Sequence, residues 1–245
     1  MRFSTIAHGA RSILGPVAAS RADALAAAVS VPANGRIVEL GCGKADLLIR
    51  LLQAHPRTTA EGFDRNPWFL ADARAAAEAA GVASRLSLIE TDAPGVALDG
   101  RAVDVAVAIG ATGIVGDGRE TLAFLASIVV PGGEVVFGDG FWAAPPPADG
   151  LAAFGMDRAE LPDGVDGFAA LGRSVGLELI AVEAASPDEW DDYEGEYGAA
   201  VDAWADANPD DPERAAFLAR SAGMRESYAA WRRTAMGFAI ARFRR

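Results

Sequence analysis

The chain of 245 residues lacks most of the residues that build covalent or metal cross-links. Cys42 is its only cysteine, so no disulfide can form within the chain. The two histidines, His8 and His55, do not stand at metal-ligand spacing with each other or with Cys42, and we therefore expect no metal centre. Stability must come from a hydrophobic core, for which 51% of apolar residues is sufficient.

Long hydrophobic runs are missing as well. No segment reaches the ~18 uninterrupted apolar residues that a membrane-spanning helix needs, and the N-terminal apolar run is too short for a signal peptide. These absences predict a soluble, cytoplasmic protein that has no membrane partner.

Basic residues are outnumbered by acidic ones, and Lys44 is the only lysine. The net charge of −12 argues against nonspecific binding to nucleic acid, because the phosphates would be repelled. We therefore expect a small-molecule partner and no nucleic acid. We also expect the Lys44 side chain to face solvent.

Short apolar segments alternate with helical patterns along most of the chain. Helices are predicted between the strands, and the predicted strands cover 36–40, 59–63, 86–90, 103–109, 134–137, 177–184 and 235–243. This alternation is typical of a doubly wound, mostly parallel α/β sheet of seven strands. Ligands of such sheets bind at the carboxyl ends of the strands.

Residues 187–233 interrupt the alternation. Two helices are predicted there, and the first carries eight acidic residues between Asp188 and Asp206 while the second carries five arginines. An antiparallel helical hairpin would let these faces attract each other. We expect this insertion to be a cap or a dimerisation element, which leaves a homodimer possible. Residues 1–30 are expected to form a helical segment over the cleft, and 31–186 plus 234–245 to form the α/β core.

A glycine-rich turn follows the first predicted strand. Gly41 and Gly43 allow a ligand to approach the backbone closely, and the next helix directs its N-terminal amides at the same place. Glu39 lies at the C-terminal end of the strand, one residue before its last residue. Its carboxylate would repel phosphate and favour a ligand with a cationic end, which points to S-adenosylmethionine.

Other residues at strand ends should converge on the same ligand. Asp64 ends the second strand, where a carboxylate can accept from both ribose hydroxyls. Asp92 follows the third strand and could accept from an adenine amine, while Ala93 offers a backbone N–H. Ile109 and Gly110 end the fourth strand and would lie beneath the ligand.

Together these segments resemble the class I S-adenosylmethionine-dependent methyltransferase family. The resemblance covers roughly residues 36–140 and rests on VELGCGKA, GFDRNP, ETDA, VAVAIGA and VPGGEVVFGDG. It implies that Glu39 and the turn with Gly41, Cys42 and Gly43 hold the methionine end, and that Arg65 packs on the adenine. It also implies an antiparallel last strand. Ala45 stands where the family usually has a third glycine, and we expect a tighter fit there without loss of binding.

The acceptor side is less defined by motifs. Methyl transfer from a sulfonium is an in-line displacement that leaves S-adenosyl-L-homocysteine, so the protein mainly supplies alignment and desolvation. His8 is the candidate catalytic residue, on the segment expected to cover the donor. The candidate substrate-binding residues follow later strands and are Asp139, Trp142, Glu189, Trp190 and Tyr193.

Two alternatives remain open at this stage. The first is a protein of the methyltransferase fold that binds ligand or partners without catalysis. The second is an NAD(P)-dependent oxidoreductase. The dinucleotide pattern Gly-x-Gly-x-x-Gly would need a glycine where Asp46 stands, which speaks against the second alternative.

Overall fold

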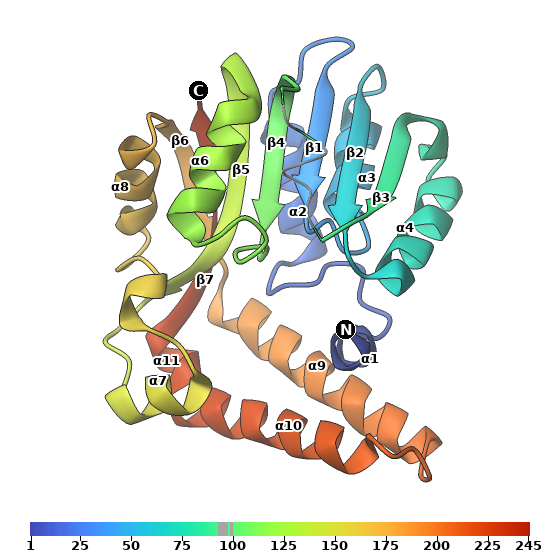
Figure 1. Ribbon diagram of the computed structural model, residues 1–245, viewed down its shortest axis with the longest axis vertical. Helices are drawn as coiled ribbons and strands as arrows, with labels where there is room; N and C mark the ends of the chain where they lie inside the picture. The colour runs from blue at the N-terminus through green and yellow to red at the C-terminus, as the bar shows by residue number, and fades with distance from the viewer. Residues whose placement is uncertain (93–97, 99) are drawn as a thin grey trace.

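The computed structural model describes residues 1–92, 98 and 100–245, and a seven-stranded sheet forms its centre (Figure 1). The strand order is β3-β2-β1-β4-β5-β7-β6. The bounds are β1 Arg36–Leu40, β2 Thr59–Asp64, β3 Leu86–Glu90, β4 Val103–Ile109, β5 Val129–Trp142, β6 Glu178–Ala184 and β7 Met236–Arg244. All neighbours pair in parallel except β7, which is antiparallel to both β5 and β6. The predicted fold class, with an antiparallel last strand, is confirmed.

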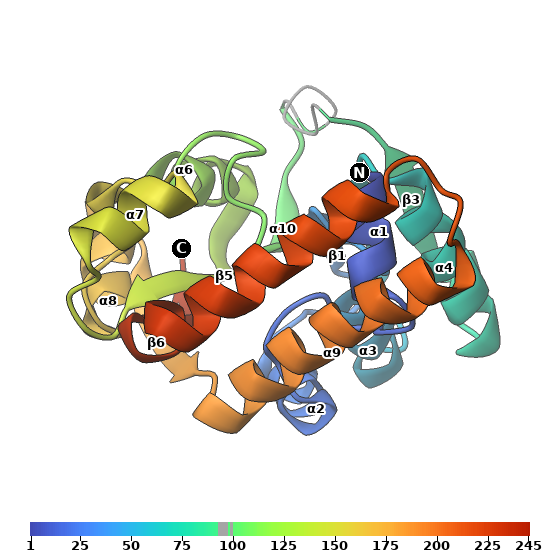
Figure 2. The ribbon, with the colours of Figure 1, turned by 90° about the horizontal axis from the view of Figure 1, so that it is seen from below.

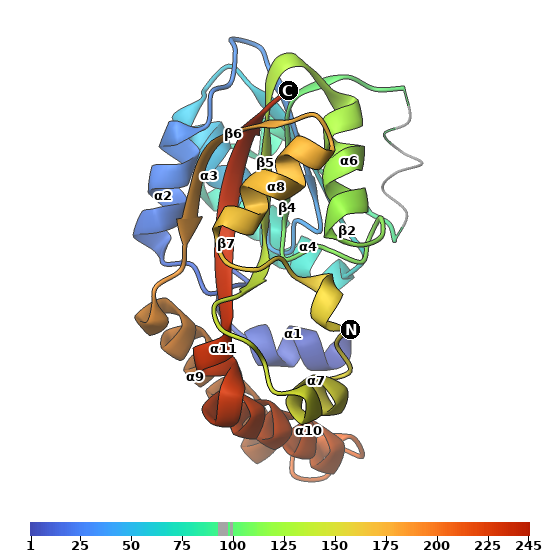
Figure 3. The same ribbon diagram turned by 90° about the vertical axis from the view of Figure 1, so that its left-hand side faces the viewer.

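Helices cover both faces of the sheet, as Figure 3 shows from the side. One face carries α2 (Ala19–Ala28), α3 (Asp46–Ala54) and α4 (Pro67–Ala79), and the other carries α6 (Gly118–Ile128) and α8 (Asp166–Ser174). Apolar side chains of β1, β4 and β5 alternate between the two faces, so each face has its own buried core. Shorter elements are η1 (Ala83–Arg85), α7 (Ala148–Phe154) and η2 (Arg158–Glu160).

The predicted helical hairpin is present. Its helices are α9 (Pro187–Ala207) and α10 (Arg214–Ser227), followed by a π-helical turn η3 (Tyr228–Arg232) and a short α11 (Arg233–Ala235) that leads into β7. The hairpin lies beyond the carboxyl ends of the central strands (Figure 1). It therefore occupies the edge of the sheet at which ligands of this fold class bind.

The N-terminal helix α1 (Arg2–His8) packs against α9, as the view in Figure 2 shows. Phe3 and Ala7 join Tyr197, Val201 and Phe217 in a small apolar cluster of their own. A helix of this length is unstable alone in water, so this packing accounts for its formation. Among the described residues, no helix is both long enough and apolar enough to span a bilayer.

Candidate functional site

The turn between β1 and α3 has a left-handed backbone at three positions. Gly41, Gly43 and Ala45 have φ angles of 66°, 54° and 56°. A Cβ on Gly41 would lie 2.7 Å from the Cβ of Ala111, so only glycine fits there. Ala45 is fully buried and adopts this conformation despite its side chain. The sequence therefore fixes a narrow backbone bend at the carboxyl end of β1.

A cavity of about 280 Å³ opens beside this turn. Its walls come from the turn, from the end of β4, from the segment that joins α1 to α2, and from α9 and β7. The predicted residues that line it are Glu39, Gly41, Cys42, Gly43, Ile109, Gly110, Trp190 and Tyr193. Residues far apart in sequence are therefore brought together on the walls of one pocket.

Glu39 is the one buried acid on the pocket wall whose carboxylate has an unsatisfied oxygen among the described residues. The side chain is 5% exposed, and its Oε2 atom is buried without a hydrogen-bond partner. Burial raises the pKa of Glu39 well above its usual value, and the nearby carboxylates of Asp46 and Asp64 raise it further. A cationic ligand in the pocket would relieve this cost, because an opposite charge favours the ionised carboxylate. The site therefore suits a cation next to the glycine turn.

Asp64 connects two turns at the edge of the pocket. One carboxylate oxygen accepts from the backbone N–H of Gly43 at 2.8 Å, and the other accepts from the N–H of Asn66 at 2.8 Å. Arg65 and Asp92 are exposed beyond it, and none of these three side chains lines the cavity. Ala93 lies outside the described residues.

Tyr193 and His8 meet at the hairpin side of the pocket. The Tyr193 hydroxyl lies 3.2 Å from His8 Nε2, and His8 Nδ1 lies 2.8 Å from the carbonyl oxygen of Ser4. A carbonyl can only accept, so Nδ1 carries the proton and Nε2 accepts from Tyr193. Burial lowers the pKa of His8, and Lys44 and Arg11 lower it further. His8 is therefore neutral near pH 7, and it reaches the cavity only through Tyr193.

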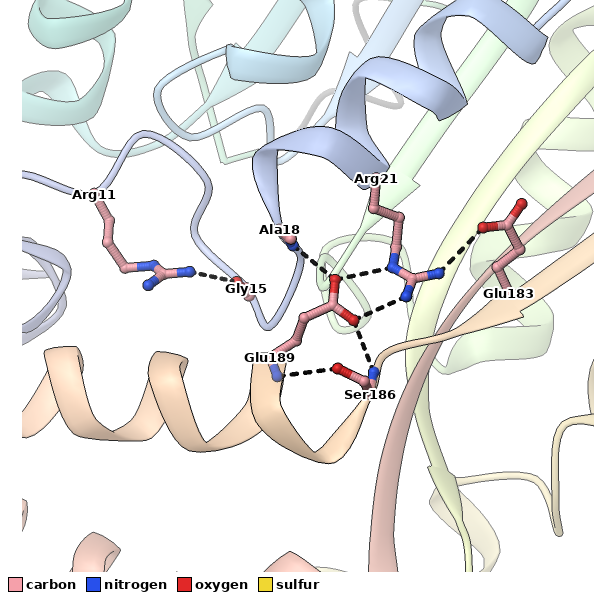
Figure 4. Close-up of polar contacts among 7 residues, drawn as sticks. All are labelled: Arg11, Gly15, Ala18, Arg21, Glu183, Ser186 and Glu189. Carbon is pink, nitrogen blue, oxygen red and sulfur yellow. Dashed lines mark hydrogen bonds and ion pairs between the residues drawn. The ribbon is translucent and has the colours of Figure 1, made fainter.

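Three predicted substrate residues do not line this pocket. Asp139 faces the opposite side of the sheet, in a cavity next to α6 and α8. Trp142 is 2% exposed, packs against Trp231, and donates its indole N–H to the Arg158 carbonyl. Glu189 accepts from Arg21 and from the backbone N–H groups of Ser186, before α9, and Ala18, before α2 (Figure 4).

The expectation for Lys44 was wrong. Its side chain is buried, and Nζ donates to the Gly9 carbonyl at 2.6 Å and pairs with Asp72 at 2.9 Å. No local pattern marks a lysine that reaches a carbonyl 35 residues earlier in the chain. Ser12 to Val17 also line the pocket. Residues 1–30 were expected to form a helical segment over the cleft, but this part is irregular and none of its residues was predicted to line the site, because an irregular segment carries no periodic signal.

Cys42 lines the pocket, but its thiol is not activated. It is 7% exposed, and burial raises its pKa strongly, with a further contribution from Glu39. Such a thiol stays protonated and is a poor nucleophile. In the part of the chain that is described, no group of three or more histidine, cysteine and acidic side chains could hold a metal ion.

The comparisons with known proteins agree with this geometry. Residues 37–133 match the family model described as a methyltransferase domain. The chain is 29% identical to the uncharacterised protein YjhP of Escherichia coli K12 over 98% of this chain and 96% of that protein.

Two solved structures with full-length similarity have informative descriptions. A SAM-dependent methyltransferase from Thiobacillus denitrificans, in complex with S-adenosyl-L-homocysteine, is 29% identical with a TM-score of 0.90. The similarity covers 100% of this chain and 99% of that structure's chain. One from Geobacter sulfurreducens, with the same ligand, is 27% identical with a TM-score of 0.91 and coverage of 100% and 98%. Together with the sheet order and the glycine turn, the methyltransferase-domain match and these two structures are consistent with a class I S-adenosylmethionine-dependent methyltransferase.

Proposed function

We propose that the protein transfers a methyl group from S-adenosylmethionine to a small-molecule acceptor and leaves S-adenosyl-L-homocysteine. The observation that carries this proposal is the buried, unpartnered Oε2 atom of the Glu39 carboxylate beside a glycine bend. Phosphate would be repelled there, whereas the charged methionine end of the cofactor is complementary to it. This disfavours NAD(P) chemistry.

We propose that the protein is located in the cytoplasm.

Further residues have proposed roles in holding the cofactor. Asp64 would accept from the ribose hydroxyls, because each of its oxygens has a lone pair beyond the backbone N–H that it already accepts. Asp92 is proposed for the adenine amine and Arg65 for the adenine face. When bound, the cofactor supplies an activated methyl group, and the chain supplies orientation and exclusion of water.

The hairpin is proposed as a cap over the acceptor. Trp190 and Tyr193, both on α9, line the pocket, so the insertion contributes directly to the site. We propose that the Tyr193 hydroxyl accepts the proton of the acceptor while passing its own to His8 Nε2. A homodimer stays a prediction, which sedimentation of the purified protein would test.

Titration calorimetry tests the proposal directly. We expect both S-adenosylmethionine and S-adenosyl-L-homocysteine to bind, and NAD and NADP not to bind. A protein of this fold that binds the donor but transfers no methyl group to any acceptor would support the non-catalytic alternative. Absence of binding to either form of the donor would refute the proposed function.

Glu39→Gln should raise the folding stability of the protein at neutral pH and weaken its binding of the cofactor. The folded-state pKa of Glu39 is raised, so the wild-type protein loses stability as the pH rises from the unfolded pKa through the folded one, and glutamine removes this loss. Cofactor affinity should fall about tenfold, through loss of one charge-assisted interaction. Thermal unfolding and calorimetry at pH 7.5 measure both effects.

The matched control for this variant is Glu61→Gln. Glu61 also has an unpartnered Oε2, but it pairs with Arg101 and lies outside the pocket. We expect this change to leave affinity unchanged and not to raise stability. A Glu39→Gln protein that is less stable than the wild type would contradict the charge argument.

His8 should make stability depend on pH in the acid range. Its pKa is lowered on folding, so the unfolded chain binds more protons between the folded pKa and about 6.5. Stability should therefore fall as the pH falls from about 6.5 through the folded pKa. Urea unfolding at several pH values should give a shallower decline for His8→Gln than for the wild type. Equal slopes would show that His8 does not titrate as its burial predicts.

A further inference from the structure

The ten residues that join α1 to α2, residues 9–18, are here called the strap. They form no helix or strand before residue 18, yet Ser12 to Val17 make up one wall of the pocket. Leu14 lies directly on the glycine turn, because a Cβ on Gly43 would come within 2.6 Å of its Cδ1. The strap therefore crosses the place at which the cofactor is proposed to bind.

The N-terminal end of the strap is held by Lys44, at the glycine turn. Lys44, which directly follows Gly43, donates from Nζ to the carbonyl oxygen of Gly9 at 2.6 Å. Gly9 has φ 45° and ψ −127°, a backbone conformation that a glycine adopts much more readily than other residues. Asp72, on α4, is the second partner of Lys44 and is not part of the strap.

The other end of the strap is held by α9 (Figure 4). Glu189 Oε1 accepts from the backbone N–H of Ala18 at 2.8 Å and from Arg21 Nε at 2.9 Å. Its Oε2 accepts from Arg21 Nη2 at 2.9 Å and from the N–H of Ser186 at 2.7 Å. Burial alone would raise the pKa of Glu189, but the donors from Arg21, Ser186 and Ala18 lower it to about 2. The carboxylate is therefore charged, and this contact persists at any physiological pH.

Between its two ends, Val17 and Ile13 pack against the hydrophobic core, and the polar contacts of the strap are weaker. Arg11 donates to the carbonyl oxygens of Ile13 at 3.2 Å and Gly15 at 3.4 Å, and it forms a partly exposed ion pair with Glu196. Exposed ion pairs of this kind contribute little to stability. The two end contacts thus account for most of the strap's polar attachment to the rest of the described chain.

We propose that Lys44 and Glu189 are positioning residues that keep the strap closed over the cofactor, and that the cofactor enters and leaves when this strap opens. This inference rests on the proposed function, since it assumes that the pocket holds the cofactor. Both contacts are made between groups of the chain. They close the strap with the same strength before and after the cofactor binds.

A kinetic signature follows from this arrangement. If entry and exit both require an open strap, then loosening either end raises the open population in the free and the bound protein by the same factor. The association and dissociation rates rise together, and the dissociation constant stays unchanged. A variant that merely damaged the site would weaken binding without speeding association.

The experiment uses stopped-flow fluorescence with S-adenosyl-L-homocysteine as the probe. Trp190 lines the pocket and can report the binding. We expect Lys44→Met and Glu189→Gln each to raise both rate constants about tenfold, because each variant lacks one charged hydrogen bond that keeps the strap closed. The dissociation constants should stay within about twofold of the wild type. Amide hydrogen exchange at residues 10–15 and 17–18 should quicken in both variants. Lys44→Arg, which can still donate to the Gly9 carbonyl, should stay close to the wild type.

Matched controls remove a neighbouring charge without freeing the strap. Asp72→Asn removes the second partner of Lys44, and Glu183→Gln removes the second partner of Arg21. Both should bind at wild-type rates. If Glu189→Gln fails to fold, Lys44→Met decides the matter, because its partners lie outside the core.

The outcomes separate this inference from the proposed function. A wild-type protein that does not bind S-adenosyl-L-homocysteine refutes the proposed function and this inference with it. A wild-type protein that binds, with association rates that are unchanged or slower in both variants, refutes the strap alone.

Discussion

Asp64→Ala is expected to weaken the binding of S-adenosyl-L-homocysteine by about 100-fold, the factor that corresponds to about 3 kcal/mol. The residue has two tasks, and alanine abolishes both. The carboxylate fixes the Gly43 and Asn66 amides relative to each other, and it is proposed to accept from the ribose hydroxyls. Loss of a charged acceptor costs more affinity than loss of a neutral one, because hydrogen bonds to a charged group are stronger. Alanine also leaves the two backbone N–H donors without their acceptor, and they must find other partners.

Calorimetry of Asp64→Asn provides the graded comparison. An amide keeps one acceptor oxygen but turns its NH₂ group toward the second backbone N–H, so this variant should lose less affinity than alanine and still bind more weakly than the wild type. Asp92→Asn is the control that leaves both turns intact, and its effect should be smaller than that of Asp64→Ala. Titration curves for Asp64→Ala that match the wild type would contradict the placement of the ribose.

The parts of the fold that the sequence predicted well are those governed by local patterns. The bounds of β1, β3 and β4 agree with the prediction at both ends. Each of these elements is bordered by turn residues and has a consistent apolar period, so propensity and burial favour the same structure. The glycine turn was equally clear, because positive φ angles require specific residues.

The positions of Asp139 and Trp142 depended on where β5 ends. The sequence predicts a strand that stops at residue 137, which would place both residues in a loop at the rim. In the structure β5 continues to Trp142, because it pairs with β7 along its whole second half. The period of two then turns Asp139 toward α6 and α8, where burial raises the pKa of its carboxyl. Pairing with a strand 94 to 110 residues later leaves no local signal.

The same limit explains the strap. Lys44, Glu189 and Arg21 make contacts across 35 to 171 residues of sequence. Lysine, glutamate and arginine are common surface residues, and only the fold brings each of these side chains to its partner. The charge difference between the hairpin helices, by contrast, could be read from the sequence. The sequence could not distinguish a buried ion pair from an exposed one.

Arg232→Met tests the buried ion pair by which η3, directly after α10, is joined to α9. Arg232 and Glu194 have side chains that are 5% and 6% exposed, with Nη1 to Oε1 at 2.8 Å and Nη2 to Oε2 at 3.1 Å. Methionine fills similar space but leaves the Glu194 carboxylate buried without its partner. Breaking such a pair typically costs about 3–5 kcal/mol, so we expect a loss of that size in the free energy of unfolding by urea.

Arg233→Met is the matched control, one residue further along the chain. Arg233 pairs with Asp191 at 2.7 Å, but the two side chains are 49% and 39% exposed, so little stability should be lost. The double variant Arg232→Met with Glu194→Leu should recover much of the loss, because no charge is then left buried. Similar losses for the two arginine variants would contradict the argument. They would mean that packing, and not the buried charge pair, joins α9 to the residues that follow α10.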